Sequence, residues 1–192
     1  MDKVILILKA LILDKEAIKQ LSDPKNNWKL LSMCITVLLG LVYGYTSISI
    51  NSETIASFET PLLRETIVPA LFLFFGFLMI LITKVGLSLL LWAGSKGLSG
   101  QGLLRVLYRN TTVALIPSVI ALPAFISQQI GTSLTTLMIL SMIVSIIWIY
   151  LICSKIVEVT QQFVPWRAYV AVLLAFIFFM SIYYIILPPA TA

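Results

Sequence analysis

The sequence predicts an all-α integral membrane protein with five transmembrane helices and a short amphipathic segment ahead of the first one. Three observations lead to this fold class. The 192-residue chain is 60% hydrophobic and only 11% charged, which leaves too little charge to cover an ordinary water-soluble domain. Apolar runs recur at the length of about 20 residues that a helix needs to cross a bilayer. With one exception, the Lys and Arg residues lie between those runs.

Residues 1–27 form the N-terminal segment of this prediction. Its first apolar run resembles a secretory signal, but Lys9 interrupts the run and no small-residue cleavage motif follows, so we expect the segment to be retained. A helix here aligns Asp2, Lys9 and Glu16 on a narrow polar stripe, and the rest of its surface is largely aliphatic. Such a helix either lies in the cytoplasmic interface or docks on the bundle; alternatively, it contacts a separate partner protein.

Residues 28–192 are predicted to form one domain of five spans. Trp28 suits the headgroup region at the start of the first span, and the polar linker Asn51–Glu65 separates this span from the second. Four glycines within Gly94–Gly102 predict a flexible turn, and the polar cluster Ser127–Ser133 predicts a hairpin within a long uncharged stretch. The predicted spans are residues 28–50, 66–93, 104–126, 134–154 and 166–187.

The positions of Lys and Arg orient these spans, because basic loops remain in the cytoplasm. Six lysines precede the first span, whereas the next loop has only Arg64 and the third loop has no basic residue. The second and fourth loops are basic again. The alternation predicts a cytoplasmic N-terminus and an external C-terminus, with Pro188 ending the last helix. The net charge of +5 follows from this topology and not from a basic face of a soluble domain, so we expect no nucleic-acid partner.

Apart from residues near the span ends, Lys84 is the one charged residue within a predicted span, where a lysine costs about 2.5 to 3.5 kcal/mol at the bilayer centre. Three interpretations are open. The long stem of Lys84 carries its charge to the cytoplasmic interface, or the charge faces the bundle interior or a lipid phosphate, with Glu158 as a counterion. In the third interpretation the second helix ends at Lys84. The second interpretation makes Lys84 and Glu158 the candidate functional polar residues.

Small residues and prolines mark two further positions in the spans. Gly40 and Gly44 form a GxxxG pattern, which allows a second helix to approach closely; we favour packing within this chain over a homodimer. Pro117 and Pro123 remove backbone donors from the third span and predict kinks there. The alternative for the prolines is a helix broken around a transport site.

The residues needed for common catalytic and metal sites are absent from the sequence. It has no histidine, no paired cysteines and no carboxylate within a span, and the glycine-rich turn lacks the spacing of nucleotide-binding loops. Cys34 and Cys153 are interpreted as buried free thiols. We therefore expect a protein that is not an enzyme, with no catalytic residue, no cofactor and no metal.

Several motifs resemble the Yip1-type membrane proteins. They are Leu21–Pro24 ahead of the first span, the glycine-containing segment Gly97–Tyr108, Pro117 in the helix that follows, Trp148, Lys155–Val159 and Arg167–Ala168. The resemblance implies five spans and a cytoplasmic N-terminus. Eukaryotic members act in vesicle trafficking with small GTPases, but their tyrosine-containing and glycine-proline signatures are missing here. The compact chain is more similar to bacterial relatives, which include partners of ABC-type exporters, and this implies a bacterial cell membrane.

The leading functional prediction is a non-enzymatic membrane protein that assembles with another membrane complex, such as an ABC-type exporter. The alternative is a small transporter, channel or lipid-handling protein that uses Lys84, Glu158 and the kinked third helix. A membrane-embedded enzyme ranks third. The expected partners are membrane lipids and either a membrane-protein partner or a second copy of the chain.

Overall fold

The computed structural model of the protein describes residues 3–23 and 25–186, with side chains through residue 182. Every regular element in this part of the chain is helical. Four helices are long and apolar enough to cross a membrane, or five if one bent pair counts as a single span. The all-α prediction is therefore confirmed, and the helices are compatible with a multi-pass membrane protein. Asp2, Pro24 and the predicted end of the last helix at Leu187 and Pro188 lie outside the described residues.

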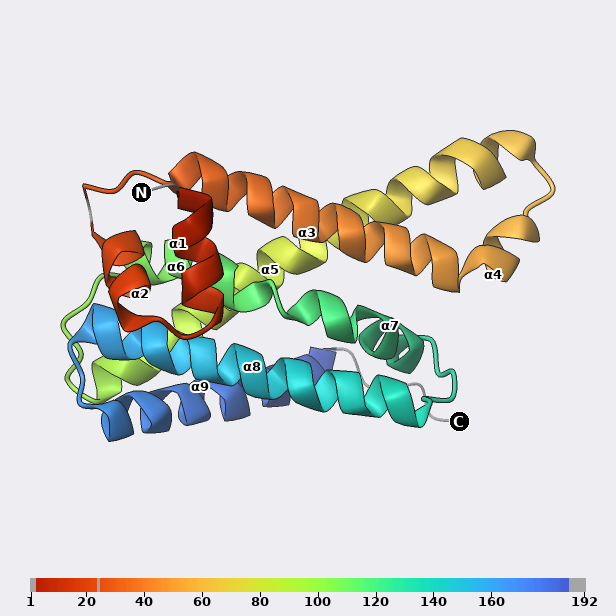
Figure 1. Cartoon of the computed structure of the whole chain (residues 1–192). Helices are drawn as coiled ribbons and strands as arrows, with labels where there is room; N and C mark the ends of the chain where they lie inside the picture. Colours follow the sequence, from red (N-terminus) through yellow and green to blue (C-terminus); the bar gives the residue numbers. More distant parts are fainter. Residues whose placement is uncertain (1–2, 24, 187–192) are drawn as a thin grey trace.

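The long helices run side by side in an elongated bundle (Figure 1). A π-helical turn, η1, continues directly into the longest helix. The elements of the bundle are α3 (Lys29–Ile50), the short α4 (Ser52–Ala56), η1 (Leu63–Ile67), α5 (Val68–Gly97), α6 (Leu104–Leu115), α7 (Ser118–Gln129), α8 (Thr136–Gln161) and α9 (Pro165–Ile186).

The connections between these helices gather at two ends of the bundle (Figure 1). The N-terminal residues, the α5–α6 connection and the α8–α9 connection lie at one end, and α4 and the α7–α8 connection lie at the other. We call the first the basic end, because most Lys and Arg residues belong to it, and the second the opposite end, where Arg64 lies. This grouping matches the alternation of basic loops in the sequence. Which end faces the cytoplasm stays a prediction.

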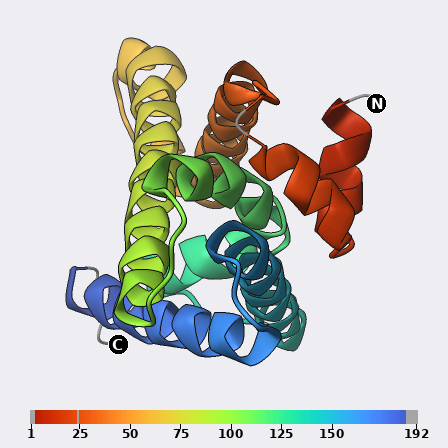
Figure 2. The same cartoon turned by 90° about the vertical axis from the view of Figure 1, so that its left-hand side faces the viewer.

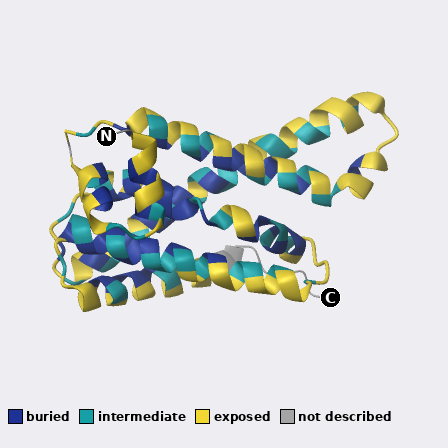
Figure 3. Ribbon diagram, in the orientation of Figure 1, coloured by how far each residue is buried: buried dark blue, intermediate teal, exposed yellow. Residues whose placement is uncertain are grey.

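Exposed residues recur along the long helices (Figure 3), and many of them are large and apolar. Phe74 and Phe75 of α5, Leu137 and Ile147 of α8 and Phe178 of α9 are all exposed. A monomeric protein in water rarely exposes so continuous an apolar surface. Lipid chains are the solvent that such a surface suits.

The N-terminal residues form two helices at the basic end, α1 (Lys3–Leu11) and α2 (Lys15–Ser22), which we call the N-terminal helix pair. A single helix through this segment, the basis of the predicted polar stripe, is wrong. Leu13 has a φ of 67°, a conformation outside the right-handed helix. Asp14 then caps α2 by accepting hydrogen bonds from the backbone N–H groups of Glu16 and Ala17.

Helices α3 and α5 cross at a point where both carry glycines. A Cβ atom on Gly76 of α5 would lie 2.5 Å from the backbone nitrogen of Gly44 and 2.7 Å from the carbonyl oxygen of Gly40. Only residues without side chains permit this backbone contact. The structure thus places the GxxxG pair of Gly40 and Gly44 in a contact within the chain, where it holds α3 against α5.

The third predicted span is sharply bent. Helices α6 and α7 meet at 78° around Ile116 and Pro117, so Pro117 marks a break and not a mild kink. Ser118 and Ser145 donate hydrogen bonds to the carbonyls of Leu115 and Pro117, at 2.6 and 2.9 Å, and these bonds satisfy backbone acceptors that the break leaves open. By contrast, α7 continues through Pro123.

Two helices extend beyond their predicted boundaries. The expected turn beginning at Gly94 is instead part of α5, because Gly94 packs against the backbone of Ala171 in α9, where its Cβ position lies 3.1 Å from the Ala171 oxygen. Helix α8 runs past Ser154 to Gln161 and carries Lys155 with it. The predicted hairpin is found between α7 and α8, where Gly131 has a φ of 72°.

Candidate functional site

Lys84 lies inside the bundle, between helices α3, α5 and α6. Its residue is only 3% exposed, and α5 continues beyond it to Gly97. Of the three interpretations of this lysine, the structure therefore shows the one that faces the interior. Removing the charge of Lys84 from solvent carries a desolvation cost that its neighbours must offset.

Polar and aromatic groups of α3 and α6 surround the Lys84 ammonium. Its Nζ donates hydrogen bonds to Thr36 Oγ1 at 2.9 Å and to Ser32 Oγ at 3.3 Å. The Tyr108 ring lies 4.4 Å from Nζ, measured to its centroid, a distance that suits a cation–π interaction. These partners are all neutral. Within the described residues, no carboxylate lies at ion-pair distance from Lys84.

Glu158, the predicted counterion of Lys84, has other partners. Its carboxylate is 5% exposed and accepts hydrogen bonds from Lys15 at 2.8 Å and from Lys155 at 2.9 Å. Lys15 belongs to α2, so this ion pair joins the N-terminal helix pair to α8. Its proximity to the Glu158 carboxylate raises the pKa of Lys15 above its ordinary value. The structure does not bring Lys84 and Glu158 together.

A groove of about 800 Å³ opens beside Lys84. One part of its wall is cationic, formed by Lys29, Lys84, Arg105 and Arg109. Amide, hydroxyl and phenol groups of Asn27, Ser32, Thr36 and Tyr108 add polar atoms, and no Asp or Glu of the described residues lines it. The remaining wall is apolar. We call this the basic groove, and its apolar lining residues are Met33, Val37, Phe77, Leu81, Leu103 and Val106.

Sequence reasoning missed most of the groove, although α3 carries a signal for it. Trp28, Ser32, Thr36, Gly40 and Gly44 follow one another at intervals of four, which places them on one face of a helix. That face is polar near the basic end, and near the middle of the span it consists of glycines. The spacing therefore indicates a helix face that contacts protein and not lipid, and it would have pointed to the partners of Lys84.

Arg109 connects the basic groove to the N-terminal helix pair. Its Nη2 donates hydrogen bonds to the carbonyls of Leu21 at 2.8 Å and Asp23 at 3.2 Å, and its Nη1 donates to Asn26 at 3.1 Å. These carbonyls lie at the C-terminal end of α2 and just beyond it, where the helix dipole favours a cation. The Trp28 indole also donates to the Leu21 carbonyl at 2.8 Å.

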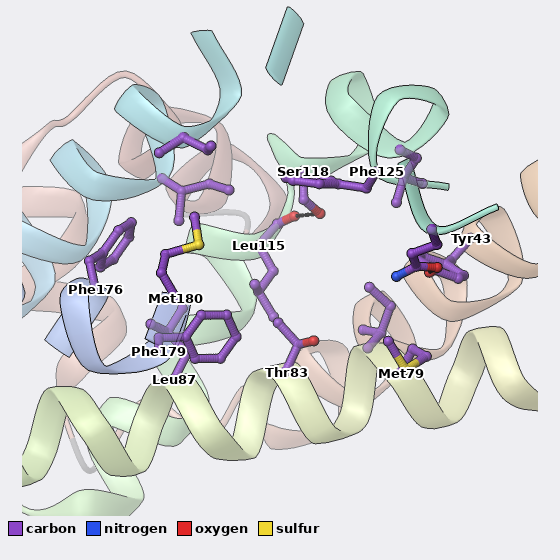
Figure 4. Close-up of a pocket in the computed structure, with 15 residues that line it drawn as sticks. Tyr43, Met79, Thr83, Leu87, Leu115, Ser118, Phe125, Phe176, Phe179 and Met180 are labelled. Carbon is purple, nitrogen blue, oxygen red and sulfur yellow. Dashed lines mark hydrogen bonds between the residues drawn. The ribbon is translucent and has the colours of Figure 1, made fainter. Parts of the chain in front are cut away.

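A second cavity, of about 140 Å³, lies on the other side of α5 under the α6–α7 bend (Figure 4). Side chains of Leu87, Leu115, Phe176 and Phe179 enclose much of it, and Thr83 points into it. The cavity has few polar groups, and none of its lining residues in the described part of the chain is charged. It therefore has the character of a packing void between α5, α7, α8 and α9. The charged and polar side chains that could bind a ligand line the basic groove instead.

The chemistry that these groups can perform is anion binding. Four cations and three hydroxyl-bearing side chains face one volume, and charge-assisted hydrogen bonds to an anion are the strong interaction available to them. Over the described ranges, no group of three or more Cys, Asp or Glu residues is placed to hold a metal ion. In comparisons with known proteins, no family model, curated protein or solved structure matches this chain.

Proposed function

We propose that the protein is a multi-pass membrane protein that binds the headgroup of an anionic, phosphate-bearing lipid in its basic groove. This conclusion is the lipid-handling alternative from the sequence. One observation carries it: Lys84 is a buried cation in a groove with three other cations, and its partners in the described part of the chain are all neutral.

The electrostatics favour an anionic ligand. Charges buried in proteins are normally paired, because an unpaired one loses its hydration without an equivalent return. Hydroxyl dipoles and a phenol ring offset only part of that loss for Lys84, and Lys29, Arg105 and Arg109 add repulsion. A phosphate group would neutralise part of this charge, and Arg and Lys are the residues that bind phosphate best.

The apolar wall favours a lipid over a free phosphate ion. Met33 and Val37 of α3 and Phe77 and Leu81 of α5 line the same groove, one or two helical turns along their helices from Lys29 and Lys84. A lipid presents an anionic head joined to an acyl chain, and this combination complements a groove with one cationic and one apolar part. Basic pockets between membrane helices near the cytoplasmic side bind lipid headgroups in this manner.

We also propose that the basic end faces the cytoplasm and that α1 lies in the membrane interface. Helix α1 runs across the long axis of the bundle at its side (Figure 1 and Figure 2). Leu6, Ile7 and Ala10 are buried against the protein, while Ile5 and Leu8 are 45% and 57% exposed, and Ile12, just beyond the helix, is 75% exposed. A helix with aliphatic residues on both sides and Lys3 and Lys9 beside them suits the boundary between headgroups and acyl chains.

The test of lipid binding compares two lysines of α5. Purified protein in a neutral detergent is titrated with phosphatidic acid, with phosphatidylcholine and with inorganic phosphate. We expect saturable binding of phosphatidic acid that Lys84→Met weakens by roughly tenfold or more. Lys96→Met, which removes a cation outside the groove near the end of the same helix, serves as the matched control and retains the affinity.

Each other outcome contradicts a specific part of the proposal. Equal affinity of the wild-type protein and the Lys84→Met variant would show that the groove is not the site. Equal binding of phosphatidylcholine would show that anionic charge is not recognised, and full competition by inorganic phosphate would leave the apolar wall without a role. No feature of the described residues supports assembly with an exporter, which stays a prediction. The resemblance to Yip1-type proteins also stays a prediction.

A further inference from the structure

We infer that a phosphate headgroup in the basic groove holds the N-terminal helix pair against the bundle, and that Arg109 is the residue that couples the two. This inference rests on the proposed lipid binding and adds that the bound lipid regulates docking of the N-terminal helix pair. Arg109 lines the groove, and the same guanidinium donates to three carbonyls at the end of α2 and beyond.

Arg109 has hydrogen-bonding capacity left for a ligand. Its three hydrogen bonds to Leu21, Asp23 and Asn26 come from the Nη atoms, and its buried Nε has no partner within the described residues. That Nε–H group is enclosed, so a phosphate oxygen reaches it only if the groove wall beside it shifts; the carbonyl contacts of the Nη atoms with α2 need not be lost. Because a guanidinium presents its five donors in a fixed fork, a ligand held at Nε also fixes the Nη groups in place.

A second contact links the helix pair to the rim of the groove. Asn27 lines the groove, and its carbonyl accepts a hydrogen bond from Lys3 of α1 at 2.8 Å. Asn27 also lies between Trp28, which donates to the end of α2, and the Asn26 carbonyl that Arg109 contacts. The rim of the groove is thus made partly from the segment that joins the helix pair to α3.

The sign of the coupling follows from charge. Without an anion, the Arg109 guanidinium is desolvated and subject to repulsion from Arg105, and the Asp23 carboxylate offsets only part of this cost, which disfavours the arrangement that α2 requires. A phosphate offsets that repulsion and leaves the three carbonyl contacts in place. Lipid binding and docking of the helix pair therefore strengthen each other, and reciprocity requires that a change in docking alters lipid affinity by the same factor.

The experiment uses a residue that docks the helix pair outside the groove. Trp148 of α8 donates a hydrogen bond from its indole N–H to the carbonyl of Leu11 at 2.8 Å, and it is not among the groove-lining residues. We expect Trp148→Phe to lower the affinity for phosphatidic acid by about fivefold. In the wild-type protein, phosphatidic acid slows amide hydrogen exchange in residues 3–23 by a similar factor.

Variants of the two groove arginines identify the coupling residue. In an Arg109→Gln background, Trp148→Phe no longer changes the affinity for phosphatidic acid. In an Arg105→Gln background Trp148→Phe still lowers the affinity, because no hydrogen bond or ion pair joins Arg105 to α2 within the described residues. Arg105→Gln itself weakens binding. A Trp148 effect of equal size in both backgrounds would remove Arg109 from the coupling.

Failure of this inference is distinguishable from failure of the proposed function. If phosphatidic acid binds in a Lys84-dependent manner but exchange in residues 3–23 does not change, the groove is a lipid site and the coupling is wrong. If phosphatidic acid does not bind the wild-type protein, the proposed function itself is wrong. If the lipid speeds exchange in residues 3–23, it competes with α2 for Arg109, and the inferred sign is overturned.

Discussion

Two buried charges at the basic end of the bundle contrast in how they are neutralised. Glu158 on α8 is paired with Lys15 and Lys155 at less than 3 Å. Lys84 on α5 is equally buried, yet it contacts two hydroxyls and a phenol ring and no carboxylate of the described chain. The Glu158 cluster is thus neutralised within the protein, whereas no carboxylate of the described residues neutralises Lys84.

The contrast teaches that burial of a charge does not by itself indicate function. Both residues stand out in the sequence as charges at or within apolar helices, and both invite the same hypothesis. Their surroundings separate them, because a paired charge that joins two helices stabilises the fold, while an unpaired one in an open groove is available to a ligand. Each prediction below tests one side of this contrast.

The largest effect is expected from Gly76→Ala, which breaks the frame of the Lys84 site. The new methyl group would meet the backbone of Gly40 and Gly44, and backbone atoms cannot move aside as flexible side chains can. We expect the free energy of unfolding to fall by about 3 kcal/mol or more, as measured by thermal unfolding in detergent, and phosphatidic acid binding to be lost as α3 separates from α5.

The matched control for this change is Gly86→Ala on the same helix. A methyl group at Gly86 lies 3.6 Å from the Phe179 ring, an ordinary contact distance, so stability and lipid binding should be retained. A Gly76→Ala variant as stable as this control would show that the α3–α5 contact is looser than the structure indicates.

The next largest effect is expected from Glu158→Gln, which removes the anion from the paired cluster. Lys15 and Lys155 lose their partner, and α2 loses an attachment to α8, so we expect destabilisation of about 1–3 kcal/mol. Faster amide exchange in α2 should accompany it. Glu53→Gln is the control, because Glu53 is an exposed carboxylate at the opposite end; equal effects of the two changes would contradict a structural role for the cluster.

The sequence predicts the spans well because each span has its own local signal. Apolar length and the positions of Lys and Arg mark where helices begin, and five such regions were expected where the structure has four long helices and a bent pair. The bend itself was underestimated. Pro117 signals a weakened helix, but its carbonyl accepts a hydrogen bond from Ser145 of another helix, and that contact is not visible in the local sequence.

The candidate site was predictable only in part. Lys84 is visible as a lone charge in a span, and Ser32 and Thr36 are visible as a polar face of α3. The pairing of Glu158 with Lys15 is not visible in the sequence. It requires the N-terminal helix pair to fold back on α8, and this in turn requires the break at Leu13. Long-range contacts of this kind follow from the packing of the whole chain.

A small effect on stability is expected from Lys84→Met, in contrast to its large effect on lipid binding. Ser32 and Thr36 keep hydrogen bonds to other groups, to Thr112 and the Arg109 carbonyl for Ser32 and to the Ser32 carbonyl for Thr36. Replacing a buried charge with an apolar side chain of similar length is often neutral. We expect thermal unfolding in detergent to show a change within about 1 kcal/mol, and a large loss would place Lys84 among the structural residues.

The smallest effect is a pH dependence of the Glu158 cluster through Lys15. The Glu158 carboxylate raises the pKa of Lys15 above its ordinary value of 10.5. A raised pKa in the folded state means that the ion pair contributes fully below pH 10.5 and is lost as the pH rises through the folded-state value. Lys15 is 59% exposed, so solvent weakens the pair, and Lys15→Met should destabilise less than Glu158→Gln. The difference in unfolding temperature between the wild-type protein and this variant should therefore shrink above pH 10.5; a difference that stays constant would mean that Lys15 acts by packing and not by charge.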